Sequence, residues 1–226
     1  MQRATADCAV SVIGLEKSFG EWPVLWDLDL TLDWGELLVL FGPNGSGKTT
    51  LLKILSTQVR PDSGSVSIAG FDLRRQANQV RRRVGVVGHD TFLHDDLTCL
   101  ENLVFYGRLF GLKQPQSKAL DSLKQVGLEN REGHRVRTLS NGMQRRVSIA
   151  RALLHDPWVL LLDEPEVGLD GPSVAMLGEL INRWTESGRS VVMTTHNADL
   201  VDSWPGHQGH MIGGHVRFSD ETEAQR

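Results

Sequence analysis

Residues 42–49 read Gly-Pro-Asn-Gly-Ser-Gly-Lys-Thr, and they follow a short apolar run at 37–41, Leu-Leu-Val-Leu-Phe. The stretch fits the pattern G-x-x-x-x-G-K-[ST], in which a strand leads into a glycine-rich loop that opens a helix. Glycines let the backbone curl until several N–H groups point at one phosphate group, and the helix N-terminus adds a favourable dipole. A glycine-rich turn that matches by chance is the alternative, but the strand–loop–helix context favours a phosphate-binding loop.

The last residues of this loop predict which phosphates it holds. Lys48 is placed to reach the β- and γ-phosphates of a nucleotide, and the Thr49 hydroxyl is placed to ligate Mg²⁺. A dinucleotide-binding fingerprint is excluded because its glycine spacing does not fit and because the loop ends in Lys-Thr. The residues expected to contact the nucleotide here are Gly42, Pro43, Asn44, Gly45, Ser46, Gly47, Lys48, Thr49 and Thr50.

Strand-like and helix-like segments alternate along the chain. Short apolar segments recur at 84–87, 159–162 and 191–194, and the segment 159–162 is apolar at every position. Such a run is typical of a parallel strand buried on both faces. The pattern predicts an α/β fold of the P-loop NTPase class, with a RecA-like parallel-sheet core. Residues 10–32 carry β-type residues with turns, which predicts an antiparallel β edge subdomain.

The segment of about 90–155 is mainly helical and predicts an α-helical subdomain inserted into the core. Thr98 and Glu101 have the spacing of a capping box at the start of one helix. A second helix is expected near 117–126, and a third after Ser140. We expect one ATPase domain over 9–218 and a polar tail over 219–226.

Polar residues follow two of the predicted strands. Asp163 and Glu164 come directly after the apolar strand 159–162, and His196 follows the strand 191–194. Ligands bind at the carboxyl edge of parallel sheets, so these side chains are expected beside the phosphate loop. Asp163 suits Mg²⁺, Glu164 is placed to orient or deprotonate an attacking water, and His196 is expected near the γ-phosphate. An acidic turn and a structural histidine are the alternatives.

Further motifs, in order and spacing, carry a resemblance to a known family. Residues 139–147, Leu-Ser-Asn-Gly-Met-Gln-Arg-Arg-Val, resemble the LSGGQ signature of ABC ATPases. Gly168-Leu169-Asp170 resembles the D-loop of that family, Thr195-His196 its switch histidine, and Phe19 the aromatic residue that stacks on adenine. The resemblance extends from about residue 10 to 218.

The resemblance implies that each ATP site is completed by residues of two copies of the chain. Each copy would bind Mg·ATP, and a homodimer would close head-to-tail over two ATP molecules. Ser140, Asn141 and Gly142 of one copy would then contact the γ-phosphate held by the other, with Asp170 beside them. Separate transmembrane permease subunits would be moved by this closure, with the chain on the cytoplasmic face of the cell membrane. The surface around residues 89–106 of this chain is expected to receive the coupling helix of the permease.

Three departures from the family pattern stand out. His89 occupies the Q-loop position, where the family has glutamine. The signature has Asn141 for glycine and Met143 for glutamine. The pair Glu166-Val167 precedes the D-loop, and the sequence offers no account of it.

These features narrow the subfamily. Gly88-His89 and the stretch 97–106 resemble the CcmA-type haem-exporter ATPases of cytochrome c maturation. The chain also resembles ATPases of ABC-2-type exporters for drugs or lipids, which is the alternative. A soluble ABC ATPase, such as an iron–sulfur assembly scaffold, is a weaker alternative. A non-hydrolysing binding module is disfavoured because Lys48, Asp163, Glu164 and His196 are all present.

Composition limits the remaining possibilities. The chain has 226 residues and a formal net charge of −4, which argues against a dedicated nucleic-acid-binding protein. Its apolar runs are far shorter than the roughly 20 residues of a membrane span, and residues 1–9 lack the pattern of a secretory leader. We therefore expect a cytosolic protein. The basic pair Arg145-Arg146 is expected on a solvated helix face.

Overall fold

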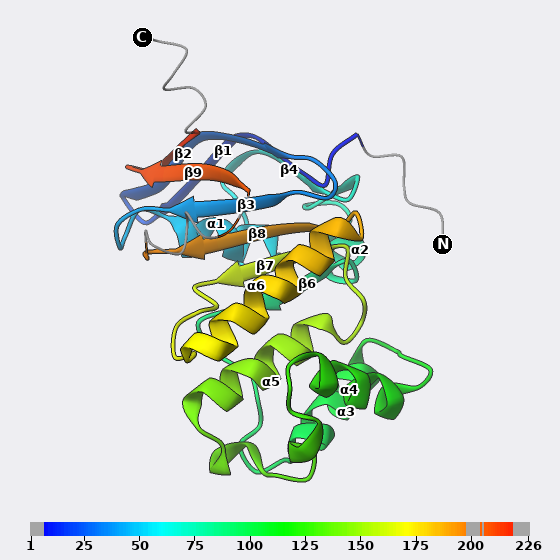
Figure 1. Ribbon diagram of the computed structural model, residues 1–226. Coiled ribbons are helices and arrows are strands. Elements are labelled where there is room, and N and C mark those ends of the chain that lie inside the picture. The colour runs from blue at the N-terminus through cyan, green and yellow to red at the C-terminus, as the bar shows by residue number, and fades with distance from the viewer. Residues whose placement is uncertain (1–6, 198–203, 205, 219–226) are drawn as a thin grey trace.

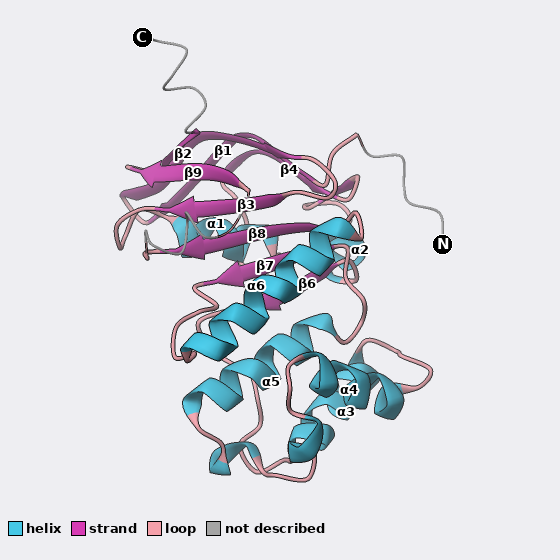
Figure 2. Ribbon diagram, viewed as in Figure 1, coloured by secondary structure: helices cyan, strands magenta, loops and turns pink. Residues whose placement is uncertain are grey.

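The computed structural model describes residues 7–197, 204 and 206–218. Figure 1 shows two sheets and a separate group of helices, and Figure 2 shows the same view by type of element. The strands are β1 (Val10–Phe19), β2 (Trp22–Leu32), β3 (Leu37–Phe41), β4 (Ser63–Ile68), β5 (Phe71–Asp72), β6 (Val84–Val87), β7 (Val159–Asp163), β8 (Ser190–Thr195), β9 (His207–Ile212) and β10 (His215–Phe218). The helices are α1 (Lys48–Leu55), α2 (Ala77–Arg81), α3 (Cys99–Leu109), α4 (Pro115–Gln125), α5 (Asn141–Leu153) and α6 (Gly171–Glu186), with 3-10 turns η1 (Glu129–Arg131) and η2 (Val136–Thr138).

The larger sheet has the order β10-β9-β3-β8-β7-β6, and only β10 runs antiparallel to its neighbour. Its central strands β3, β7 and β8 are buried on both faces because successive side chains alternate between two cores. In β7, Leu160 and Leu162 join the core under α5 and α6, whereas Leu161 joins the core around α1. The predicted parallel-sheet fold is therefore confirmed.

The smaller sheet is antiparallel and has the order β2-β1-β4-β5. Its inner face packs against α1, so α1 lies between the two sheets. The sequence indicated β1 and β2 only. The structure adds β4, whose serine-rich and glycine-containing sequence gives little hydrophobic alternation, and β5, which is only two residues long.

The helices α3, α4 and α5 gather at one end of the molecule (Figure 1). The predicted capping box begins α3: the Glu101 N–H donates to Thr98 Oγ1 over 3.1 Å, and the Thr98 N–H donates to Glu101 Oε2 over 2.8 Å. The α5 helix packs against β6 and joins this group to the larger sheet. Among the helices of the described residues, none combines the length and apolar character that a membrane crossing requires.

The contact between β6 and α5 generates a stability prediction. A Cβ at Gly85 would lie 2.4 Å from the Ala152 carbonyl oxygen and 2.8 Å from Pro157 Cγ. Gly85→Ala should therefore lower the free energy of unfolding by about 1–3 kcal/mol, as for other overpacked sites. Urea denaturation measures the change. Gly133→Ala is the matched control, because a Cβ at Gly133 meets no atom within 4 Å; equal stability of the two variants would contradict the prediction.

Candidate functional site

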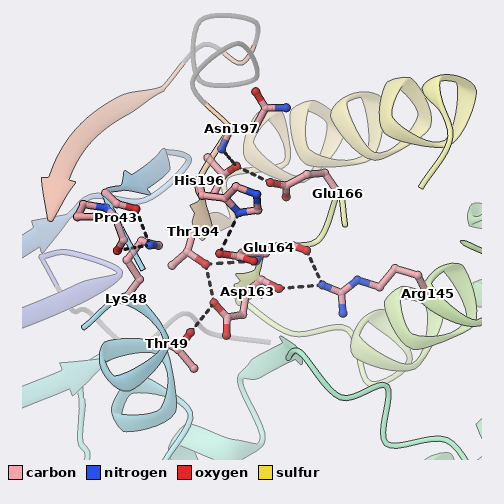
Figure 3. A network of polar contacts seen from close by, with 12 residues as sticks. Pro43, Lys48, Thr49, Arg145, Asp163, Glu164, Glu166, Thr194, His196 and Asn197 are labelled. Carbon is pink, nitrogen blue, oxygen red and sulfur yellow. Dashed lines mark hydrogen bonds and ion pairs between the residues drawn. The ribbon is translucent and has the colours of Figure 1, made fainter. Parts of the chain in front are cut away.

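The phosphate loop connects β3 to α1, and the lysine at its end is held inside its curl. Lys48 is only 5% exposed. Its Nζ donates to the carbonyl oxygens of Gly42 over 2.7 Å and of Pro43 over 3.1 Å (Figure 3). The first N–H groups of α1 have no intrahelical acceptors, and its first turn carries no acidic residue. A buried ammonium group and a helix N-terminus thus converge on one place, which favours an anion.

Close backbone contacts explain the two end glycines of the loop. A Cβ at Gly42 would lie 2.2 Å from the Met211 carbonyl oxygen, and one at Gly47 would lie 2.7 Å from Leu25 Cδ2. Gly47 also has a φ of 104°, which side chains disfavour. The loop therefore packs closely against β2 and β9, and a side chain at position 42 or 47 would displace it.

Oxygen atoms suited to a hard cation lie beside the loop. Thr49 Oγ1 donates to Asp163 Oδ1 over 3.3 Å, and Thr194 Oγ1 donates to the same oxygen over 2.6 Å. Asp163 is 6% exposed at the end of β7. One hydroxyl and one carboxylate fit Mg²⁺, which takes few protein ligands and completes its shell with phosphates and water. No group of three or more potential ligands among His, Cys, Asp and Glu occurs in the part of the chain that the structure describes.

Glu164 and His196 face each other across the ends of β7 and β8. Their Oε1 and Nδ1 atoms are 3.2 Å apart, and the two side chains are 22% and 55% exposed. Glu164 has a φ of 46°, a conformation that costs energy in a residue other than glycine and that recurs at active sites. Its N–H donates to the Thr194 carbonyl oxygen over 3.1 Å, which fixes the turn. The structure thus brings together the carboxylate and imidazole that the sequence singled out.

Arg145 corrects an expectation from the sequence. It was expected on a solvated helix face, but it is 6% exposed and points from α5 into the strand ends. Its guanidinium donates to the carbonyl oxygens of Asp163 over 2.8 Å, of Glu164 over 2.6 Å and of Pro165 over 3.2 Å, and also to that of Gly88. Burial lowers the pKa of Arg145, and the carboxylates of Glu166, Asp163 and Glu164 oppose this effect. Arg145 is therefore a structural clamp on the acidic turn.

A second buried contact joins the same strand ends. Thr195 Oγ1 donates to Glu166 Oε1, and Glu166 is 9% exposed. Sequence reasoning missed both residues as parts of the site. The available signal was the pair of hydroxyl residues, Thr194 and Thr195, directly before His196.

His89 lies at a cavity of about 300 Å³ that Thr49 and Asp163 also line. Its side chain is exposed, at the turn that follows β6. His89, at the Q-loop position, therefore lies on the side of the phosphate loop where Thr49 and Asp163 lie.

Phe19 lies at the end of β1, 50% exposed, with Lys17 Nζ 5.3 Å from its ring centroid. Trp22 is its cross-strand partner and is 79% exposed. No specific role for Trp22 was expected from the sequence.

The signature residues lie at the start of α5 and away from the phosphate loop of the same chain. Ser140 is the N-cap of α5 and accepts a bond from the Met143 N–H over 3.3 Å. Asn141 is exposed, and a Cβ at Gly142 would lie 2.9 Å from the Gly168 carbonyl oxygen. Asp170 caps α6 by accepting from the Ser173 N–H over 3.0 Å, and hydrogen bonding to the side chain and then to the N–H of Ser173 lowers the pKa of Asp170. Among the described residues, no hydrogen bond joins Ser140–Gly142 or Asp170 to residues 42–50.

The chain is similar to proteins whose roles are named. The family model described as "ABC transporter" matches residues 25–167. The linearmycin resistance ATP-binding protein LnrL of Bacillus subtilis is 34% identical over 83% of this chain and 61% of its own length. The daunorubicin resistance ATP-binding protein DrrA3 of Streptomyces coeruleorubidus is 37% identical over 87% of this chain and 63% of its own length. The chain thus spans less than two thirds of these relatives.

A solved structure has the same fold. It is described as the dimeric post-hydrolysis state of an ATP-binding cassette bound to ADP and Pi, and it is 29% identical to this chain. The TM-score is 0.84, over 93% of this chain and 97% of that one.

The Arg145 clamp generates the second prediction. Arg145→Met removes the guanidinium donor from the carbonyl oxygens at 88 and 163–165, of which that of Glu164 keeps the Val167 N–H as a donor. A buried carbonyl oxygen left without a donor costs about 1–3 kcal/mol. We expect the free energy of unfolding to fall by about 3 kcal/mol or more, as measured by urea denaturation. Arg108→Gln, on the exposed side of α3, is the control and should stay within about 0.5 kcal/mol of wild type. If Arg145→Met and Arg108→Gln have the same free energy of unfolding, Arg145 does not stabilise the acidic turn.

Proposed function

The chain belongs to the ABC transporter family, and we propose that it is the ATP-hydrolysing subunit of an exporter. The family model and the solved cassette confirm the expected ABC ATPase domain. One observation carries the proposal: the catalytic and metal-binding candidates from β7 and β8 lie together at the N-terminus of α1, around the phosphate loop (Figure 3).

In the proposed hydrolysis, side chains of this chain contact the phosphates and the attacking water. Lys48 exchanges the carbonyl oxygens of Gly42 and Pro43 for oxygens of the β- and γ-phosphates. Thr49 and Asp163 would hold Mg²⁺, which would supply neutralisation of the phosphate charge when bound. Glu164 takes a proton from the attacking water, whose oxygen bonds to the γ-phosphorus as the bond to the β-phosphate oxygen breaks. His196 holds the Glu164 carboxylate through the Nδ1–Oε1 contact.

We extend the proposal to a homodimer that closes over two ATP molecules. In one copy, Ser140, Asn141 and Gly142 are exposed or partly exposed at the N-terminus of α5, where a helix favours an anion. A second copy could present its bound γ-phosphate there. The relative bound to ADP and Pi is a dimer, which supports this arrangement. Asp170, beside this surface, is proposed at the same interface, and Phe19 is proposed to stack on adenine.

The permease is proposed to dock beside His89, over residues 89–106. A cavity of about 400 Å³ lies there, with Phe92, Tyr106 and Phe110 among its lining residues. Burial lowers the pKa of His155 to about 4, so its imidazole is uncharged at neutral pH, whereas Arg81 and Arg151 also line the cavity. The aromatic lining suits apolar side chains of a membrane partner, and the chain is proposed to sit on the cytoplasmic face of the cell membrane.

Two cargo classes fit the proposed exporter. The relatives named for drug resistance support an ABC-2-type exporter of drugs or lipids. Haem export in cytochrome c maturation is the second candidate, and it is supported by Gly88-His89 and the stretch 97–106.

Co-purification distinguishes the two cargoes. The tagged chain is isolated from detergent-solubilised membranes, its partners are identified by mass spectrometry, and the haem absorption is recorded. We expect polytopic membrane partners in either case. Bound haem indicates the cytochrome-maturation exporter, whereas a haem-free ABC-2-type permease indicates a drug or lipid exporter. Recovery of no membrane partner would contradict the exporter proposal and favour a soluble ABC ATPase.

The role of Glu164 is tested by Glu164→Gln. This variant should bind ATP with unchanged affinity, lose about 10²–10⁴-fold in turnover, and accumulate as a nucleotide-bound dimer. Phosphate release, calorimetry and size-exclusion chromatography with Mg·ATP measure the three effects. Glu179→Gln, on an exposed side of α6, is the matched control. Undiminished hydrolysis by Glu164→Gln would exclude the general-base role.

A further inference from the structure

Glu166 is a buried carboxylate that neither the family motif nor the stability of the fold explains. Its side chain is 9% exposed, and its Oε1 accepts a hydrogen bond from Thr195 Oγ1. Within the described residues, its Oε2 is buried and has no hydrogen-bond partner. A buried carboxylate oxygen without a partner is costly, and an apolar residue of similar size is often at least as stable.

The neighbouring cation does not remove this cost. The hydrogen bonds of Arg145 go to backbone carbonyl oxygens, at Gly88 and at 163–165, rather than to the Glu166 carboxylate. Glu166 affects Arg145 only through its charge, by opposing the effect of burial on the pKa of the guanidinium. Among the described residues, the one hydrogen bond of the Glu166 carboxylate is therefore the bond from the Thr195 hydroxyl.

That bond leads to the imidazole of the site. Thr195 Oγ1 also accepts from the Asn197 N–H over 3.0 Å, so one hydroxyl joins Glu166 to both sides of His196 (Figure 3). His196 Nδ1 lies 3.2 Å from Glu164 Oε1. Two carboxylates of the same turn, at 164 and 166, thus hold the imidazole and the backbone that carries it.

We propose that Glu166 is a positioning residue, which fixes the turn 195–197 through the Thr195 hydroxyl so that His196 holds Glu164 in its catalytic orientation. The inference rests on the proposed ATP hydrolysis. Glu166 also begins the segment that reaches Gly168, whose carbonyl oxygen faces Gly142, and the N-cap of α6 at Asp170. The Glu166–Thr195 bond therefore connects the surface proposed for the second copy to the water-activating pair.

A double-mutant cycle tests the bond. Glu166→Met and Thr195→Val each remove it, and each should lower kcat about tenfold or more with the KM for ATP within about twofold of wild type. Glu166→Gln keeps an acceptor oxygen and should stay within about threefold of the wild-type kcat. Because both changes break one interaction, the double variant should be no slower than Thr195→Val alone. Glu179→Gln is the charge-matched control.

The outcomes separate positioning from folding. Glu166→Met should retain wild-type resistance to urea or exceed it, whereas a merely structural role predicts lost stability with the lost turnover. Wild-type kcat in Glu166→Met, or effects of the two single variants that multiply in the double variant, would overturn the proposal. If Glu166→Met does not fold, Thr195→Val compared with wild type still tests the proposed positioning role. An unchanged kcat in Thr195→Val would overturn that role.

An NMR readout keeps the inference separate from hydrolysis. The imidazole resonances of His196 are assigned with a His196→Gln variant. They should shift in Glu166→Met and Thr195→Val, and they should stay in place in Glu166→Gln and Glu179→Gln. Unshifted resonances in the first two variants would overturn the positioning role. A wild-type chain without ATPase activity would contradict the proposed function, while the NMR comparison would still test the geometry.

Discussion

The site depends on the order of three parallel strands. β8 lies between β3 and β7, with Leu40 opposite Thr194 on one side and Asp163 opposite Thr194 on the other. Because all three strands run the same way and end level, the phosphate loop, the acidic turn and the switch histidine leave the sheet at one edge. The alternating apolar side chains of these strands hold that order by filling a core on each face.

Buried polar groups make this edge specific at a cost in stability. Arg145 takes its guanidinium out of water to bind four backbone carbonyl oxygens, and Glu166 buries a carboxylate against one hydroxyl. Glu164 adds a strained backbone conformation, with its φ of 46°. Such features rarely maximise stability, but they hold a turn in one conformation. The surrounding apolar core supplies the free energy that they consume.

The proposed mechanism follows from the separation of two surfaces in one chain. The phosphate loop and the acidic turn lie at the carboxyl edge of the larger sheet, whereas Ser140–Gly142 open α5 beside Gly168. A nucleotide held by one copy and capped by another would couple hydrolysis to closure. The Glu166–Thr195 bond would carry that coupling from the D-loop segment to His196.

The sequence by itself determined the phosphate loop, the parallel sheet, the acidic turn and the capping box, because each depends on residues close together in the chain. It did not reveal β4, whose serine-rich and glycine-containing segment lacks a hydrophobic period, or β5, which is too short to show one. It was wrong about Arg145 because the burial of that side chain depends on Gly88, which lies 57 residues away. It gave no account of Glu166, whose partner Thr195 lies 29 residues away. Only the tertiary structure decided these contacts, since a polar side chain is buried or solvated according to the neighbours that folding brings to it.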